Sequence, residues 1–420
     1  MQNLSCPFFI KKIFKPFSRE EILFLLCAMA YGFLISLEYG ITRPAGNCVF
    51  LSLYGSSFFP YAWVATVPIN FYLVGLYNRY LPKWGCLKTF SFIVFFVIAI
   101  NTLCAFYLKE MPALSFFQYI WKDIYILLMF KQLWSLIHST VSTERAKFFY
   151  GLIFGAGGIG SIIGSIVPGF FAVMLGSVKL FLFTAPIYLL LLYVYAILLK
   201  HSGENAYGTP EEAAKPKGRG YGLIGRSPLL ILALLVVLGM QIGVAFIDYN
   251  YNYLLERSIL DLDLRTEYTG RLVGLTNIIS TSLQFAGVML VIHFFGLKKT
   301  HLMVPIILCL SCVLFLVMPT FAIVSASYVI IKTLDYSIFS VAREMLYIPM
   351  KTDEKFRAKA IIDVFVYRTA KAVASLFLLG ISYLPFAHST MISWVSIAIF
   401  IGWALAVTFM FKYYEAPVVV

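Results

Sequence analysis

Several ionisable residues lie inside long apolar stretches of the sequence. They include Lys122 with its neighbour Asp123, then Asp248, and finally Arg368 with Lys371. A charge in hydrocarbon costs on the order of 3 kcal/mol, so such residues face a partner or a water-filled cavity. Three cations beside two carboxylates leave an excess of positive charge. This pattern predicts a cavity that binds an anionic substrate, such as a phosphorylated or carboxylated metabolite.

The sequence leaves more than one role open for these residues. Lys122 and Asp123 are adjacent, and adjacent helix positions point about 100° apart, so each is expected to need its own polar surroundings. Asp248 could be a protonatable coupling group, and Lys332 could simply neutralise Asp335 on the same helix face. Four aromatic residues could stack a planar ring, although packing is the commoner role: Trp121, Trp134, Tyr249 and Tyr251. Other ionisable residues inside apolar runs are Glu38, Lys131, Arg271 and Asp363.

Enzymatic and metal-binding patterns do not fit this sequence. None of the five histidines forms a metal-spaced pair within a span, and no nucleophile elbow or paired-carboxylate motif is present. The Cys309–Cys312 pair lies in an apolar run that disfavours thiolates. We therefore predict no enzymatic activity, no cofactor and no metal.

A glycine-rich stretch between residues 155 and 160 superficially resembles a phosphate-binding loop. It lacks the Lys-Ser/Thr pair of that motif, and no strand is expected before it. Small residues also let two membrane helices approach closely. We therefore assign Gly155, Gly158 and Gly160 to helix packing, and to the seam along which a rocking transporter moves.

The composition indicates the elements that must position these residues. Of 420 residues, 61% are hydrophobic and only 13% are charged, with a mean hydropathy of +0.86. Soluble domains carry about 25% charged residues, so much of this surface must face lipid. A span needs about 20 apolar residues, which leaves room for about twelve. The predicted spans are 22–41, 59–77, 89–108, 113–137, 149–174, 178–199, 229–254, 269–295, 300–319, 321–345, 358–384 and 390–412.

These spans predict an all-α membrane protein with two six-helix halves. We place the N-terminal half at 1–199, a polar linker at 200–227 and the C-terminal half at 228–420. Segments Arg145–Lys147 and Arg357–Lys359 open corresponding spans of the two halves, as parallel repeats require. Basic turns at 77–85 and 295–300 also correspond.

The basic residues predict the orientation in the membrane. Lysine and arginine favour one set of loops about fourfold, which predicts that both termini and the central linker are cytoplasmic. The formal net charge of +13 is then topogenic, with the lipid bilayer rather than nucleic acid as the partner. The basic segment near the N-terminus leads into a long span with no cleavage site of a secretory signal.

Five longer strings of the sequence are distinctive: Glu144–Gly151 after Trp134-Ser135, Ala342–Met350 with Arg343 and Glu344, Arg357–Val364, Phe14–Leu23 and Arg43-Pro44. They resemble the nucleotide transporter (ATP/ADP carrier) family of plastids and intracellular bacteria. The resemblance implies a major-facilitator-like twelve-helix fold in a bacterial inner membrane. It also implies transport of nucleotides, typically ATP in exchange for ADP. Arg343 and Glu344 are expected to act in gating or packing.

The family's charged positions match only in part. Where the family shows a Lys-Asp pair after Arg-Pro, this sequence has Gly46 and Asn47, and Lys122 stands where the family has a glutamate. Asp248 preserves the charge of a second glutamate, and Lys371 preserves a lysine. These changes are compatible with anion binding through a rearranged set of charges, and equally with a different substrate or with proton-driven uptake.

Together these features predict a transporter of nucleotides or nucleotide-like anions that works by alternating access. Lys122, Arg368 and Lys371 would hold the anion beside Asp123 and Asp248. One alternative is a proton-coupled importer of another anionic metabolite. Another is a non-transporting membrane scaffold or receptor. The sequence does not indicate an oligomeric state.

Overall fold

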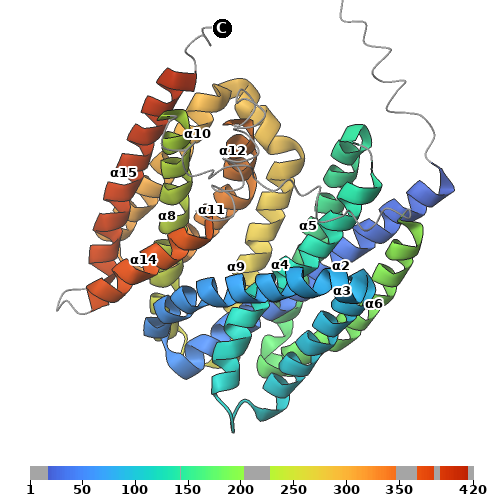
Figure 1. The fold of residues 1–420 in the computed structure, drawn as a ribbon. Helices are drawn as coiled ribbons and strands as arrows, with labels where there is room; N and C mark the ends of the chain where they lie inside the picture. Colours follow the sequence, from blue (N-terminus) through green and yellow to red (C-terminus); the bar gives the residue numbers. More distant parts are fainter. Residues whose placement is uncertain (1–17, 142, 203–227, 347–366, 383–387, 415–420) are drawn as a thin grey trace, which may run out of the picture. The chain divides into compact units, whose positions relative to one another are not determined.

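The computed structural model describes residues 18–141, 143–202, 228–346, 367–382 and 388–414. The chain packs into two compact units, which are described separately (Figure 1). Unit 1 comprises residues 1–46 and 72–213, and unit 2 comprises residues 47–71 and 214–420. Two long helices, α2 (Arg19–Tyr54) and α3 (Phe59–Tyr107), each contribute residues to both units.

The remaining elements each belong to one unit. Unit 1 holds α4 (Ala113–Thr140), α5 (Thr143–Leu175), the 3₁₀ segment η2 (Val178–Phe183) and α6 (Thr184–His201). Unit 2 holds the 3₁₀ segment η1 (Ser56–Phe58), α8 (Pro228–Ser258), α9 (Leu262–Ser282), the π segment η3 (Leu283–Gly287), α10 (Val288–Val317), α11 (Phe321–Leu334), the π segment η4 (Asp335–Phe339), α12 (Ser340–Leu346), α14 (Tyr367–Ser382) and α15 (His388–Tyr414).

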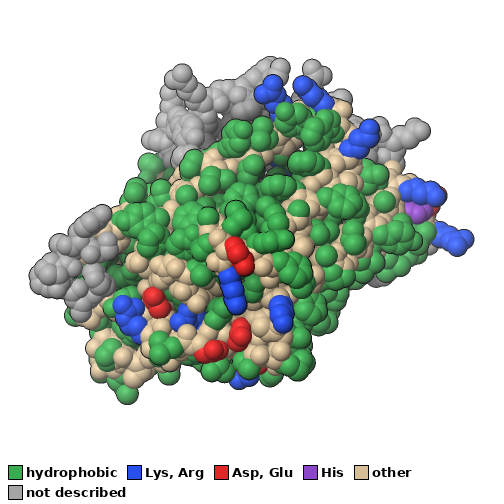
Figure 2. Space-filling view, turned by 90° about the horizontal axis from the view of Figure 1, so that it is seen from below, with side chains coloured by type: hydrophobic (Ala, Val, Ile, Leu, Met, Phe, Trp, Pro, Cys, Tyr) green, Lys and Arg blue, Asp and Glu red, His purple; other side chains and the backbone are tan. Residues whose placement is uncertain are grey.

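The helices have the lengths and surfaces of membrane spans, and the predicted fold class is confirmed. The described part of the chain contains no strand, and nine of its helices are long and apolar enough to cross a membrane. Large apolar side chains are widely exposed, including Met174 at 73% and Phe294 at 75%. Figure 2 shows hydrophobic side chains over most of one face. Such a surface suits lipid, where apolar exposure has no cost.

Two glycines break long helices into separate spans. As one straight rod, α3 with its 49 residues would be about 74 Å long, more than twice the hydrocarbon thickness. It breaks at Gly85, with φ 76° and ψ 168°, and α10 breaks at Gly296 with φ 73° and ψ 162°. Only glycine adopts such angles without strain. The two breaks lie in the basic turns that the sequence pairs between its halves. The count of twelve spans stays a prediction, because α14 is described over 16 residues.

Glycines bring α2 and α5 into backbone contact inside unit 1. A Cβ atom on Gly160 would lie 2.3 Å from the carbonyl oxygen of Phe33, and one on Gly164 would lie 2.2 Å from that of Leu37. Neither gap admits a side chain. Of the other glycines assigned to packing, Gly155 is buried and Gly158 is half-buried on α5.

Helix α8 forms the centre of unit 2, between α15, α11 and α14 (Figure 1). Rings from α15 fill the space over two of its glycines. A Cβ on Gly239 would lie 3.0 Å from Trp403, and one on Gly243 would lie 2.4 Å from a ring carbon of Phe400. This packing places the polar segment 248–252 of α8 in the protein interior.

Candidate functional site

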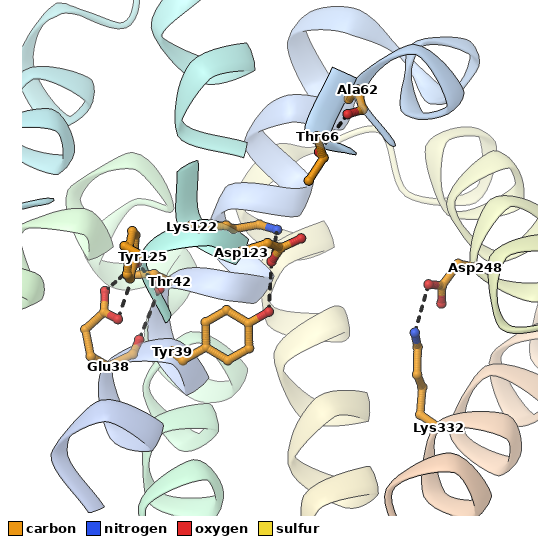
Figure 3. Close-up of polar contacts among 10 residues, drawn as sticks. All are labelled: Glu38, Tyr39, Thr42, Ala62, Thr66, Lys122, Asp123, Tyr125, Asp248 and Lys332. Carbon is orange, nitrogen blue, oxygen red and sulfur yellow. Dashed lines mark hydrogen bonds and ion pairs between the residues drawn. The ribbon is translucent and has the colours of Figure 1, made fainter. Parts of the chain in front are cut away.

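Lys122 and Asp123 form an ion pair on α4 in unit 1. Lys122 Nζ lies 3.1 Å from Asp123 Oδ1, and Tyr39 on α2 donates a hydrogen bond of 2.9 Å to the same oxygen (Figure 3). The ammonium also lies 4.2 Å from the ring centroid of Tyr119, a cation–π distance. Lys122 is 2% exposed. The two neighbours pair with each other because the long lysine stem bends back, and each also contacts a tyrosine of its own.

Gly46 lies directly against the stem of Lys122. A Cβ atom at Gly46 would stand 3.4 Å from Lys122 Cδ and 2.8 Å from Gln118 Oε1. The side chain of Lys122 on α4 therefore lies beside Gly46, the position on α2 where the resemblance leads one to expect a lysine. A lysine is present at this place in the packing, but it comes from α4 instead of α2. In the sequence, Gly46 and Lys122 are two separate departures from the family pattern, and only the packing of α2 against α4 shows that they are neighbours.

Asp248 forms a second buried ion pair, inside unit 2. Lys332 Nζ on α11 donates a hydrogen bond of 2.8 Å to Asp248 Oδ2 on α8 (Figure 3). The side chains are 7% and 10% exposed, respectively. The other oxygen of the carboxylate, Oδ1, is buried and accepts no hydrogen bond from any described residue. The sequence left open whether Lys332 neutralises Asp335, and the structure gives Lys332 a carboxylate partner on another helix, Asp248 on α8.

Asp335 marks a change of helix type next to this ion pair. The π segment η4 begins at Asp335, whose Oδ1 accepts a hydrogen bond of 3.3 Å from Gln241 on α8. Gln284 in the other π segment, η3, donates to the Tyr336 carbonyl, so the two π segments are joined. π segments are frequent at functional sites, because they re-aim side chains without ending the helix. Hydropathy does not reveal them.

Lys371 on α14 lies over an aromatic ring in unit 2. Its ammonium is 4.3 Å from the ring centroid of Trp63, a buried residue near the start of α3. Trp63 was not among the aromatic residues that the sequence singled out. Arg368 belongs to the same helix, but its side chain lies outside the described part.

Arg343 and Glu344 occupy the short helix α12. The guanidinium of Arg343 lies 6.0 Å from the ring centroid of Phe339, and Glu344 is exposed. Neither the ring contact of Arg343 nor the exposure of Glu344 distinguishes a role in gating from a role in packing.

The described site residues include buried cations that can hold an anion. Each unit contains a buried lysine paired with an aspartate, and within the described ranges no group of three His, Cys, Asp or Glu residues could hold a metal ion. An ammonium paired with one carboxylate can exchange that partner for a phosphate oxygen. Aromatic rings at Tyr119 and Trp63 flank two of the cations.

Comparisons with known proteins agree with this chemistry. Residues 318–414 match the family model "TLC ATP/ADP transporter". The chain is 23% identical over 308 residues to "ADP,ATP carrier protein 1" of Chlamydia pneumoniae, which covers 62% of this chain and 58% of the carrier. It is 21% identical over 347 residues to "ADP,ATP carrier protein 5" of Rickettsia conorii, covering 70% and 68%. The chain thus spans less than two thirds of the Chlamydia carrier.

Solved structures show the same architecture. A nucleoside transporter, NupG, superposes with a TM-score of 0.61 at 12% identity, covering 93% of this chain and 99% of that one. A D-xylose-proton symporter superposes with a TM-score of 0.66 at 13% identity, covering 93% and 97%. The predicted resemblance to the ATP/ADP carrier family and the major-facilitator-like fold are both confirmed.

Proposed function

We propose that this chain is a secondary transporter that carries nucleotides across a membrane by alternating access. The observation that carries the proposal is the pair of buried lysines, Lys122 and Lys332, each of which forms an ion pair with an aspartate. A buried ammonium needs a counter-charge at every stage. In the empty protein Asp123 and Asp248 supply it, and a phosphate group can replace them.

The nucleotide is the substrate that these groups fit best. In each unit a phosphate group can supply charge for a lysine that lies beside an aromatic ring on which a planar base can stack: Lys122 with Tyr119 in unit 1, and Lys371 with Trp63 in unit 2. The carriers of Chlamydia and Rickettsia have ADP and ATP in their names. We extend this pair of substrates to the present chain and propose exchange of ATP for ADP.

We further propose that the chain lies in a bacterial inner membrane with both termini in the cytoplasm. The supporting observation is the lysine and arginine bias of the loops. The halves that alternate would be residues 1–199 and 228–420, joined by the linker 200–227. Gly160 and Gly164 hold α2 and α5 in backbone contact within the N-terminal half, which would let that half move as one body.

Uptake into vesicles tests the proposal directly. Purified protein is reconstituted, and labelled ATP is supplied outside vesicles that contain ADP, another nucleotide or buffer alone. Exchange predicts uptake that needs internal nucleotide. Uptake that ignores internal nucleotide but follows a pH gradient would favour a proton-coupled importer. Uptake of no nucleotide, with correctly folded protein, would reject the function. If Lys371→Ala and Asp248→Asn both leave the cellular activity intact, a scaffold or receptor is the better account.

A further inference from the structure

Glu38 on α2 is a fully buried acid that the proposed nucleotide site does not use. Its side chain is 0% exposed. Tyr125 on α4 donates to Oε1 at 3.0 Å, Tyr188 on α6 donates to Oε2 at 3.0 Å, and Thr184 on α6 donates to Oε1 at 3.1 Å (Figure 3 shows Glu38 and Tyr125). Thr42, one turn along α2, lies 3.3 Å from the Tyr125 hydroxyl. We call these five residues the Glu38 cluster.

No basic side chain pairs with Glu38 among the residues that the structure describes. Its partners from α4 and α6 are hydroxyl groups, and on its own helix Thr42 donates to the Glu38 carbonyl at 3.2 Å. The charged residues that α4 carries nearby, Lys122 and Asp123, pair with each other. The side of α2 that meets α5 faces glycines and backbone. The titratable groups facing Glu38 are therefore Tyr125 and Tyr188, neither of them a cation.

The cluster can accommodate one additional hydrogen. Asn101 on α3 donates to Thr184 at 2.9 Å, while its own Oδ1 is buried and accepts from no described residue. Hydroxyl groups both donate and accept, so they can turn when Glu38 changes from an acceptor to a donor. A protonated Glu38 would donate to one of these hydroxyl oxygens, and a rotation of the Asn101 amide would then turn its oxygen toward Thr184 as the acceptor of the displaced hydrogen. The geometry thus suits both the charged and the neutral acid.

We propose that the Glu38 cluster is a proton-binding site, which takes up a proton from water during the transport cycle. The inference rests on the proposed transport function and adds an ion to it. A buried acid with no cationic partner is the kind of group that exchanges protons when its surroundings open. Its complete burial means that the proton is held inside unit 1 and exchanges only when helix packing changes. A metal ion fits less well, because hydroxyl hydrogens already occupy both carboxylate oxygens.

Infrared difference spectroscopy of the purified protein detects such a proton without any need for transport. Spectra recorded between high and low pH separate the C=O band of a protonated carboxyl from the bands of the carboxylate. Glu38→Gln keeps the size and polarity of the side chain but cannot titrate. Glu20→Gln, an exposed position in the first turn of the same helix, is the matched control.

The proposal expects a carboxyl band of a buried acid that disappears in Glu38→Gln and remains in Glu20→Gln. Tyr188→Phe, which keeps Glu38 but removes one donor, should retain the band with a changed pH midpoint. The same band in a folded Glu38→Gln protein would overturn the proposal. A carboxyl band of the native protein that changes with sodium at constant pH would overturn it as well. Should Glu38→Gln fail to fold, an unchanged midpoint in Tyr188→Phe would overturn it.

Reconstituted vesicles connect the proton to transport. A pH gradient should alter the nucleotide uptake of the native protein, and Glu38→Gln should abolish that response while keeping exchange at equal pH. If the infrared band depends on Glu38 but no nucleotide is transported, the proposed function fails and the proton site stands. If nucleotides are transported and the band does not depend on Glu38, only the proton site fails.

Discussion

Lys332 and Asp248 join two helices of unit 2 by a buried ion pair, with 2.8 Å between the ammonium nitrogen and the carboxylate oxygen. The residues are 84 positions apart in the sequence. Their pairing explains how α8 and α11 each tolerate a charge in a membrane protein. Substituting either residue therefore removes an ion-pair partner of the other.

Removing one member of this pair should be worse than removing both. Lys332→Met and Asp248→Asn should each lower the unfolding free energy by about 3–5 kcal/mol, because each leaves an uncompensated buried charge. The double variant should recover a large part of that loss. Thermal unfolding in detergent, arranged as a double-mutant cycle, measures the coupling. Losses that simply add would show that the two charges are independent.

Alanine at the contact between α2 and α5 should destabilise unit 1. Gly160→Ala or Gly164→Ala puts a methyl group within 2.3 Å of a backbone oxygen on α2, so the helices must separate. Overpacking of this kind costs about 1–3 kcal/mol. Gly151→Ala, on the same helix but in open space, should be neutral or gain up to ~1 kcal/mol of helix propensity. Equal melting temperatures for the three variants would contradict the close approach.

A cation should be transferable from α4 to α2 at the Lys122 site. Lys122→Ala should weaken nucleotide binding at least tenfold, about 1.4 kcal/mol, because a buried positive charge is lost. Adding Gly46→Lys should restore part of the affinity, since the new side chain enters the space that the Lys122 stem has left. Binding of labelled ATP to the purified protein checks both steps. Lys131→Ala, on α4 at a more exposed position, is the control, and failure of Gly46→Lys to rescue would separate the two positions.

The ring of Trp63 should position the Lys371 ammonium. Trp63→Leu removes a cation–π contact of about 0.5–2 kcal/mol and should raise KM for nucleotide severalfold. Trp63→Phe keeps a weaker aromatic face and should have a smaller effect. Lys371→Gln, which removes the charge itself, should be the most severe of the three. Initial rates of uptake into vesicles rank them, and a Trp63→Leu protein that matches the native KM would show that the ring does not position Lys371.

The sequence could predict the helices and several polar residues of interest, but not their partners. Lys122, Asp123 and Asp248 stand out because each interrupts an apolar run. Tyr39, Gln241 and Trp63 carry no such signal, because an uncharged residue interrupts an apolar run less clearly than an ionisable one does. Glu38 was visible as an ionisable residue within a span. Its surrounding hydroxyl groups come from α2, α4 and α6, and no local pattern links those helices.

Composition, hydropathy and the basic residues at 77–85 and 295–300 determined from sequence alone that this chain is a helical membrane protein with corresponding turns in its two halves. Those properties are local, because a span or a turn depends on residues adjacent in the chain. Tertiary structure alone decided that Lys332 faces Asp248, that Lys122 bends back to Asp123 over Gly46, and that Glu38 is enclosed by hydroxyl groups. Which charges neutralise one another depends on how helices pack, and burial makes that choice energetically decisive.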